Sequence, residues 1–212
     1  MRGGSSSGCR RSTRGYDPTR RLSGVAPSPA GDELEPRFRQ AFRRQAGGVA
    51  VITYLDAGRR PRGMTATAVS SVSATPPRLL VCLNRASRGR DEIVHAGRFG
   101  VNVLALPQRE IADACSRPGG DKVLSPAWLL ADAAPRATPV LEAALTHCEC
   151  AVGPIYEVET HSIVIGRVED IWLGRLDEPL VYFDGTYSTL DRSPEKSLQA
   201  MWDAFESAYW NL

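Results

Sequence analysis

Cysteine is scarce in this sequence, which contains five cysteines among 212 residues. An odd number at this low density does not build the disulfide framework that stabilises small secreted domains. No apolar run reaches the roughly 20 residues that a membrane helix requires, and the N-terminus lacks the apolar middle region of a secretory signal. These absences predict a cytoplasmic protein without a membrane partner.

A strong charge of one sign is also missing. The 26 Lys and Arg residues nearly balance the 24 Asp and Glu residues, so the formal net charge is +2. Nucleic-acid-binding domains are usually far more basic, and disordered chains are less hydrophobic than the 42% found here. The length allows one domain with a substantial core, plus tails. We expect a globular domain that does not bind nucleic acid.

The two ends of the chain differ in composition from its middle. Arg, Gly and Ser make up most of residues 1–31, which predicts a disordered basic tail over 1–34; a targeting peptide and contact with an acidic partner are the alternatives. Near the other end, large apolar residues follow helical spacing and predict an amphipathic helix over 192–212 that packs on the core or on a second copy. Those residues are Leu198, Met201, Trp202, Phe205 and Tyr209. Residues 35–191 remain as the predicted folded domain.

Short β-branched and apolar segments alternate with turn residues along this domain. The predicted strands are 49–55, 63–73, 79–83, 99–104, 145–152, 156–171 and 180–183, and the predicted helices are 35–45, 87–95 and 107–115. We expect Gly153-Pro154 to join the two long strands, and 117–139 to form a long loop with a helical patch near Trp128. Strands outnumber helices without regular βαβ alternation, which favours a mainly β, antiparallel, closed barrel with peripheral helices.

The most informative stretch runs from Gly63 to Ser87. Its small side chains, such as Ala66 and Ala68, allow the close approach of a flat ring. Its hydroxyls and the predicted helix start at Ser87 offer hydrogen bonds to a phosphate, and nearby arginines add positive charge. The hydroxyls belong to Thr65, Thr67, Ser70 and Ser71, and the arginines are Arg85, Arg88 and Arg90. This chemistry suits a flavin, although a stretch of this composition, taken alone, is more often an ordinary strand.

Several common site motifs are absent. No Gly-x-Gly-x-x-Gly follows a strand and there is no phosphate-binding Gly-x-x-x-x-Gly-Lys-Ser/Thr loop, so a nicotinamide cofactor is not expected in a Rossmann crevice. Cys148 and Cys150 share one face of a predicted strand beside His147, but no second pair with ligand spacing accompanies them. Buried free thiols are the favoured interpretation, and no metal is expected.

The order of the motifs resembles the flavin reductase-like family of FMN-binding split barrels, the short reductase components of two-component flavin-dependent monooxygenases. Each motif is short, but together they follow the family's order over residues 36–190. The matching motifs are 38–42, 47–53, Gly63-Met64-Thr65, 71–73, Pro76-Pro77, 81–84, Ser87, 99–104, Gln108, Asp121-Lys122, Glu149-Cys150, His161, 165–168, 179–183, Tyr187 and Leu190.

The resemblance implies an antiparallel split β-barrel and an NAD(P)H:flavin oxidoreductase, which passes a hydride from NADH or NADPH to FMN or FAD and supplies the reduced flavin to a partner monooxygenase. It also implies a homodimer with the flavin in a groove near the interface. Thr65, Ala66 and Thr67 would border the isoalloxazine ring, and Phe99 would lie near the ring or the nicotinamide. The ribityl phosphate region would be held by Ser71, Val72, Cys82, Leu83, Asn84, Ser87 and Arg88.

His161 is the candidate catalytic residue. The family commonly has Gly-Asp-His at this point, where the histidine lies beside the nicotinamide; here Glu159-Thr160 precede it and depart from that pattern. Two alternatives therefore stay open. One is a flavin-binding protein without turnover, and the other is a reductase of the same fold that acts on another acceptor, such as a corrinoid or a metal complex.

Overall fold

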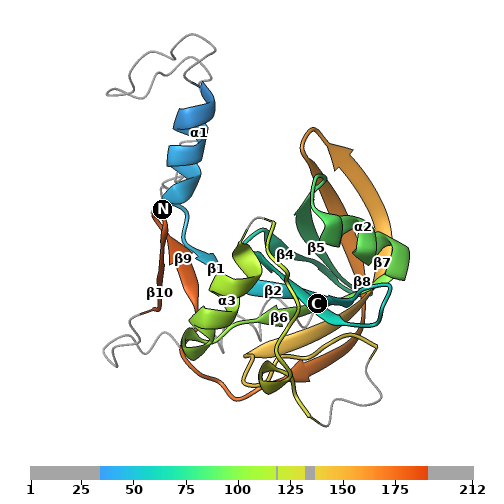
Figure 1. The fold of residues 1–212 in the computed structure, drawn as a ribbon. Coiled ribbons are helices and arrows are strands. Elements are labelled where there is room, and N and C mark those ends of the chain that lie inside the picture. Colours follow the sequence, from blue (N-terminus) through green and yellow to red (C-terminus); the bar gives the residue numbers. More distant parts are fainter. Residues whose placement is uncertain (1–33, 118, 132–136, 191–212) are drawn as a thin grey trace, which may run out of the picture. The chain divides into compact units, whose positions relative to one another are not determined.

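The computed structural model describes residues 34–117, 119–131 and 137–190 (Figure 1). The predicted helix over 192–212 lies outside these residues, as does all but the last residue of the predicted tail. The chain divides into one unit that ends at Arg39 and a second that starts at Gln40. Helix α1 (Leu34–Arg43) confirms the helix predicted over 35–45, and an Arg39–Glu35 ion pair of 2.6 Å joins two of its turns.

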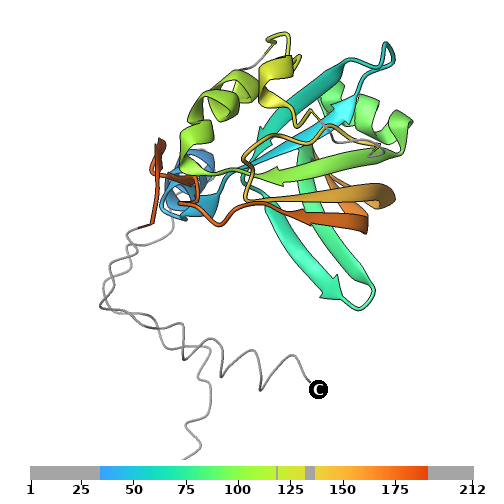
Figure 2. The ribbon, with the colours of Figure 1, turned by 90° about the horizontal axis from the view of Figure 1, so that it is seen from below.

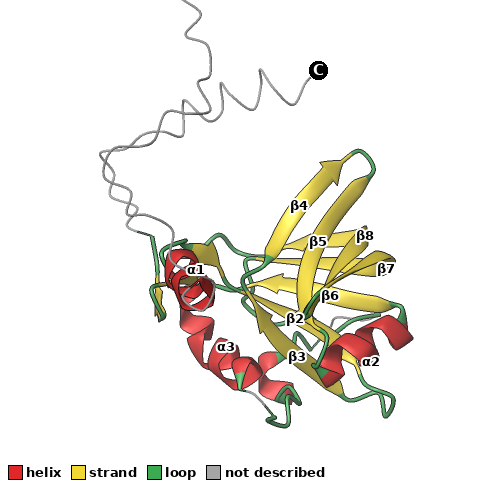
Figure 3. Cartoon of the chain, turned by 90° about the horizontal axis from the view of Figure 1, so that it is seen from above, coloured by secondary structure: helices red, strands yellow, loops and turns green. Residues whose placement is uncertain are grey.

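The second unit is mainly antiparallel β-sheet, as predicted. Seven strands pair in the order β3-β2-β6-β7-β8-β5-β4, and three short strands pair in the order β1-β9-β10. Figures 2 and 3 show the larger sheet curling into the split barrel. The strands are β1 (Gly47–Gly48), β2 (Ala50–Leu55), β3 (Pro61–Ala66), β4 (Val69–Ala74), β5 (Pro77–Asn84), β6 (Arg98–Val103), β7 (Thr146–Val158), β8 (His161–Leu173), β9 (Val181–Phe183) and β10 (Thr186–Ser188).

The strand predicted over 63–73 is two strands in the structure. β3 ends at Ala66 and β4 begins at Val69, because β3 pairs with β2 whereas β4 pairs with β5 at the other end of the sheet order. The chain therefore crosses between the two ends of the sheet at residues 67 and 68. A local composition of small and hydroxyl residues does not reveal such a change of partner.

The expected turn at Gly153-Pro154 is wrong. β7 continues through both residues to Val158, and the chain turns at 159–160 instead. The pairing of β7 with β8 skips between Val152 and Ile155, so the glycine and the proline occupy a bulge. A bulge tolerates a proline because the unpaired position needs no amide hydrogen, and a Cβ at Gly153 would lie 2.9 Å from the Ile165 carbonyl oxygen.

The helices agree with the sequence. α2 (Arg88–Ala96) begins after Ser87 and ends at Gly97, which has a φ of 68° and donates its amide to the Ile93 carbonyl. A 3₁₀ turn, η2 (Leu106–Gln108), leads into α3 (Arg109–Ser116), and η3 (Pro126–Trp128) is the helical patch predicted in the long loop. No described helix has the length and apolar character needed to cross a membrane.

Two apolar cores meet at β2, which is buried on both faces. Ala50, Ile52 and Tyr54 face the interior of the curled sheet, where Ile93 of α2 also packs. On the opposite face Val51 packs in a second core, built with α3 and with Leu124 of the loop that follows it. The nearly continuous apolar run of this strand, interrupted at Thr53, is explained by burial on both faces.

A buried polar cluster joins the sheet to the segment before β7. Asn102 accepts a hydrogen bond from the Leu141 amide at 2.9 Å and donates to Thr53 Oγ1 at 3.0 Å. The same Asn102 carbonyl oxygen lies 3.0 Å from His147 Nδ1, and His147 Nε2 lies 3.4 Å from Thr138 Oγ1. These bonds satisfy side chains that have almost no contact with water.

Candidate functional site

A cavity of about 720 Å³ opens between β3, the end of β5, the start of α2, Ser116 and residues 119–122. Its volume lies in the range of sites that bind small molecules and cofactors. It is larger than the two other cavities described below, of about 630 and 580 Å³. Segments far apart in the sequence therefore surround one space.

The entry into α2 leaves the first amides of a helix at the wall of this cavity. Asn84 Oδ1 accepts the Ala86 amide at 2.9 Å, and its carbonyl accepts the Ser87 amide at 3.0 Å, so the chain turns sharply out of β5. The Ser87 hydroxyl contacts Met64 Sδ at 3.1 Å and makes no capping bond to the helix. The first amides of a helix have no acceptor within the helix, and they attract negatively charged groups.

The arginines of this cavity are paired with acids. Arg88 Nε lies 2.8 Å from Glu92 Oε1 on the next turn of α2. The buried Arg62 bridges Asp56 at 2.8 Å and Asp121 at 2.7 Å. The hydrogen bond from Arg62 holds the pKa of Asp56 well below its usual range, with the Arg60 amide also contributing. Arg62 is thus compensated, whereas Arg88 remains 74% exposed and able to reach a ligand.

Lys122 reaches the cavity through an extension of the sheet. Its carbonyl accepts the Gly63 amide at 3.0 Å, and the Leu124 amide donates to Pro61 at 2.8 Å, so residues 122–124 run along β3. Thr65 donates its hydroxyl to the Ala112 carbonyl at 2.6 Å, which fixes α3 against the same strand. These contacts hold β3 and Lys122 in place in the wall of the cavity.

A second cavity of about 580 Å³ adjoins the first, and Thr65, Ser116 and Lys122 line both. Two aromatic rings form part of its wall. Tyr182 and Tyr187 meet edge to face with 5.4 Å between ring centroids, and the Arg109 guanidinium lies 5.7 Å above the Tyr187 ring. The two cavities provide room for a flat molecule and for a second group beside it.

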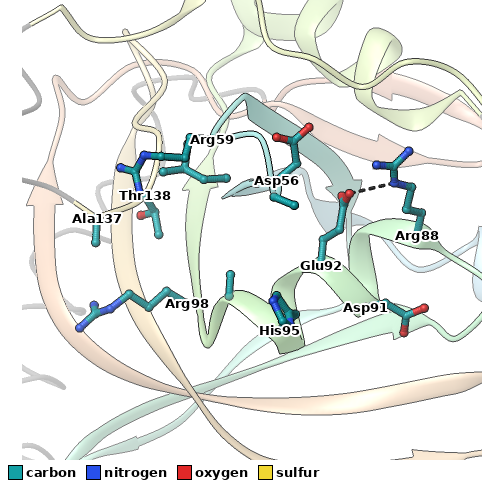
Figure 4. Close-up of a pocket in the computed structure, with 12 residues that line it drawn as sticks. Asp56, Arg59, Arg88, Asp91, Glu92, His95, Arg98, Ala137 and Thr138 are labelled. Atoms are coloured by element: carbon teal, nitrogen blue, oxygen red, sulfur yellow. Dashed lines mark hydrogen bonds and ion pairs between the residues drawn. The ribbon is translucent and has the colours of Figure 1, made fainter.

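A third cavity of about 630 Å³ lies on another side of α2 (Figure 4). Arg88 and Glu92 line both this cavity and the first, so this helix forms a shared wall. The arginines and the acidic side chains around it are balanced, three against three. They are Arg59, Arg88, Arg98, Asp56, Asp91 and Glu92. Such a balance does not favour an anionic ligand, and only one residue predicted for the flavin site lies here.

The structure brings most of the residues predicted to bind a flavin to the largest cavity. Those residues are Thr65, Ala66, Cys82, Leu83, Asn84, Ser87 and Arg88. Thr67 lines the adjoining cavity instead. Thr65 and Ala66 come from β3, whereas Asn84, Ser87 and Arg88 come from the end of β5 and the entry into α2.

Three predicted residues lie elsewhere. Phe99 has no exposed surface and packs in the first core, so a contact with a bound flavin or nicotinamide is at odds with the structure. Ser71 and Val72 are exposed on β4 and line none of the three cavities. The pairing of β4 with β5 is irregular between Ser71 and Ser73, and this bulge alters the direction of the neighbouring side chains.

His161 is the exposed first residue of β8. It pairs with Val158 across the hairpin and with Asn84 of β5, and its Nδ1 lies 2.9 Å from the Thr160 hydroxyl. It lines none of the three cavities, although its partner Asn84 lines the largest. Glu159, in the turn before it, has a φ of 44°. The catalytic role of His161 stays a prediction.

Other cavity residues had no role assigned from sequence. Tyr54, Arg62, Met64 and Glu92 come from elements whose mutual packing is not visible in the chain, while Asp121-Lys122 stood among the motifs without a function. Burial, and then the charge of Glu92, raise the pKa of Tyr54, so its hydroxyl stays neutral in the cavity wall. Asp121 and Lys122 reach the cavity because residues 122–124 pair with β3, and no local sequence pattern reveals this long-range pairing.

Of the two cysteines beside His147, Cys150 is buried and Cys148 is half-buried, and both are free thiols. Cys148 and Cys150 both pack against the first core, and burial raises the pKa of Cys150 to about 12. Burial also raises the pKa of Cys148. Within the described ranges, no group of three His, Cys, Asp or Glu side chains is arranged to hold a metal ion.

Known proteins that are similar to this chain are flavin reductases. A family model described as a flavin reductase like domain matches residues 42–191. A reductase subunit of a flavin-dependent monooxygenase from Rhodococcus jostii (strain RHA1) is 30% identical over 177 residues, which cover 82% of this chain and 86% of that protein. A flavin reductase (NADPH) from Lentzea aerocolonigenes is 41% identical over 136 residues, 64% of this chain and 78% of that one.

Relatives differ in length. A probable flavin reductase from Rhizobium meliloti (strain 1021) is 38% identical over 136 residues, and the match spans only 43% of that longer protein. Among solved structures, the flavin reductase component of a bacterial two-component tryptophan halogenase has a TM-score of 0.67 and 31% identity, covering 74% of this chain and 98% of that one. The styrene monooxygenase flavin reductase from Pseudomonas putida S12 has a TM-score of 0.66 and 28% identity, covering 73% and 97%. The chain belongs to the flavin reductase like family.

Proposed function

We propose that this chain is an NAD(P)H-dependent flavin reductase, which transfers a hydride from NADH or NADPH to FMN or FAD and supplies the reduced flavin to a partner monooxygenase. The observation that carries the proposal is the 720 Å³ cavity, which collects seven of the residues predicted for the flavin in a chain of this family. The flavin supplies the chemistry, by accepting the hydride at its N5 atom, and the protein supplies position.

The residues present fit a flavin. The free amides at the start of α2 and the exposed Arg88 guanidinium are donors suited to a phosphate. The small Ala66 side chain leaves room for a flat ring beside Thr65, whose hydroxyl is already engaged by α3. The α2 amides and Arg88 would hold the phosphate, and Thr65 and Ala66 would lie beside the ring, so the protein would supply position.

A homodimer is part of the proposal, and the outer face of the sheet supports it. Leu80 pairs with Ile165, and Ile163 pairs with both Cys82 and Tyr156, so these side chains form a continuous apolar ribbon across β5, β8 and β7. All five are at least partly exposed, and none of them belongs to either core. Contiguous exposed apolar surface of this kind marks an interaction site.

The direct test is NADH and NADPH oxidation by purified protein with FMN or FAD. We expect oxidation of at least one nicotinamide that depends on both protein and flavin. A folded preparation that oxidises neither nicotinamide with either flavin would contradict the proposal. Supply to a partner is tested by adding a flavin-dependent monooxygenase, whose product should form only when the reductase and NAD(P)H are both present.

A flavin-binding protein without turnover is the second candidate. It is favoured by the position of His161 outside the cavities and by the altered residues before it. It predicts that FMN binds in an equilibrium titration while NADH and NADPH stay unoxidised. The two measurements on one preparation separate the candidates.

A further inference from the structure

Lysine is rare in this chain, which has 24 arginines and two lysines, Lys122 and Lys196. Lys196 lies outside the described residues. Lys122 is half-buried and lines both the 720 Å³ cavity and its neighbour. Arginine supplies nearly all the positive charge of this protein, whereas a lysine lies where the two cavities meet.

Lys122 also differs from the arginines around it in having no acidic partner among the residues that the structure describes. Arg62 is held by two carboxylates, Arg88 by Glu92, and Arg109 lies 3.8 Å from an Asp113 oxygen. None of the ion pairs or side-chain hydrogen bonds between described residues involves the Lys122 ammonium. Its charge acts on the buried Cys115, where burial raises the thiol pKa to about 11 and Lys122 opposes that rise.

The position of Lys122 separates it from the phosphate region. The proposed phosphate site lies at the start of α2, whereas Lys122, like Thr65, also lines the second cavity, which no residue of α2 lines, and the flavin ring is proposed to lie beside Thr65. A half-buried, uncompensated charge acts more strongly than an exposed one, because less water screens it. The Lys122 ammonium would therefore attract negative charge on the flavin ring.

We propose that Lys122 is a catalytic residue whose ammonium faces the N1–C2 carbonyl edge of the flavin ring and stabilises the negative charge that the ring gains on reduction. This rests on the proposed function. NAD(P)H gives up a hydrogen with two electrons and becomes NAD(P)⁺, and the flavin that receives them gains one negative charge. Lys122 keeps its proton throughout and forms no bond. A fixed charge placed where charge develops lowers the barrier without rearrangement.

The first experiment compares FMN with riboflavin, which has the same ring and no phosphate. We expect Lys122→Gln to lower kcat about tenfold or more with both flavins, and Lys122→Arg, which keeps the charge, to lower it less. Arg88→Gln is the matched control for the phosphate region, and its KM should rise more for FMN than for riboflavin. A Lys122→Gln defect confined to FMN would mean that Lys122 binds the phosphate, and would overturn the proposal.

The second experiment needs no turnover. FMN bound to wild type and to Lys122→Gln is reduced chemically, and its absorption is followed with pH to find where the anionic form takes up a proton. We expect this midpoint to rise by about one pH unit in Lys122→Gln, a tenfold change in the proton equilibrium. Thermal unfolding of each variant confirms that it is folded.

The outcomes separate the two claims. Identical midpoints in both proteins overturn the role of Lys122. A wild type that binds FMN and shows the shifted midpoint relative to Lys122→Gln, but oxidises no NAD(P)H, supports the role of Lys122 and overturns the proposed function. A wild type that binds no flavin overturns both.

Discussion

At the scale of single residues, Gly100 permits the buried polar cluster beneath it. A Cβ at this position would lie 2.5 Å from His147 Cε1, 2.5 Å from Thr53 Oγ1 and 2.9 Å from Thr138 Oγ1. We expect Gly100→Ala to lower the free energy of unfolding by about 1–3 kcal/mol, as for overpacked cores. Urea unfolding measures this. Gly48→Ala is the control, because nothing lies within 4 Å of its added Cβ, and equal losses in the two variants would contradict the explanation.

Asp56 makes stability depend on pH. Its pKa is lowered chiefly by the hydrogen bond from Arg62, so the ionised carboxylate stabilises the fold above the ordinary carboxyl pKa of about 4, and this contribution is lost as the pH falls further. Asp56→Asn should lower the urea midpoint at pH 7, and the gap to wild type should narrow toward pH 3.

The control for Asp56 is the exposed Asp184, whose carboxylate lies 3.7 Å from Arg43 Nε. Asp184→Asn makes the same change of charge where water screens the pair, and we expect little effect at any pH. A gap between Asp56→Asn and wild type that stays constant down to pH 3 would contradict the proposed titration.

Much of the candidate site could be predicted residue by residue, because hydroxyls, small side chains and arginines cluster within one short stretch. Phe99 could not be placed, since every residue of β6 apart from its two ends is buried and alternation no longer separates inward from outward faces. Lys122 could not be placed either, because its position depends on a long-range pairing with β3.

At the scale of elements, the segment 137–141 is attached to the sheet by side chains. The Leu141 amide and the Thr53 hydroxyl both bond to Asn102, and Thr53 also donates to the Pro139 carbonyl at 2.6 Å. We expect Asn102→Ala to cost about 3 kcal/mol, since several buried partners lose their bonds at once. Hydrogen exchange should show faster exchange of the Leu141 amide.

The exposed Asn84 provides the comparison. Its side chain accepts one hydrogen bond, from the Ala86 amide, so Asn84→Ala should cost about 1 kcal/mol or less. Equal destabilisation by the two alanine variants would show that the buried cluster does not attach the segment.

Element type was predictable along most of the chain, while strand partners were not. The β-branched runs and the capping residues identified β2, β6, α2 and α3, because these signals are local. Gly153-Pro154 has the composition of a turn, yet the long pairing of β7 with β8 absorbs it as a bulge. The energy of pairing distant residues outweighs the local preference.

At the scale of the whole molecule, the apolar ribbon makes a prediction about assembly. Light scattering should give a mass about twice the 23.0 kDa of the chain. Ile163→Glu places a charge in the middle of the ribbon and should shift the protein to monomer. Ile171→Glu introduces the same charge on β8 outside the ribbon, at a residue already 53% exposed, and should leave the mass unchanged. A monomeric wild type, or a dimeric Ile163→Glu variant, would contradict this.

Cys82 belongs both to the ribbon and to the wall of the largest cavity. If two copies join at the ribbon, each borders the other's flavin, and a solitary chain leaves that edge open to water. Dilution would then weaken flavin affinity as the dimer dissociates into single chains. The concentration of the protein in the cell would set the fraction of flavin sites that a second copy covers, and no effector would be needed.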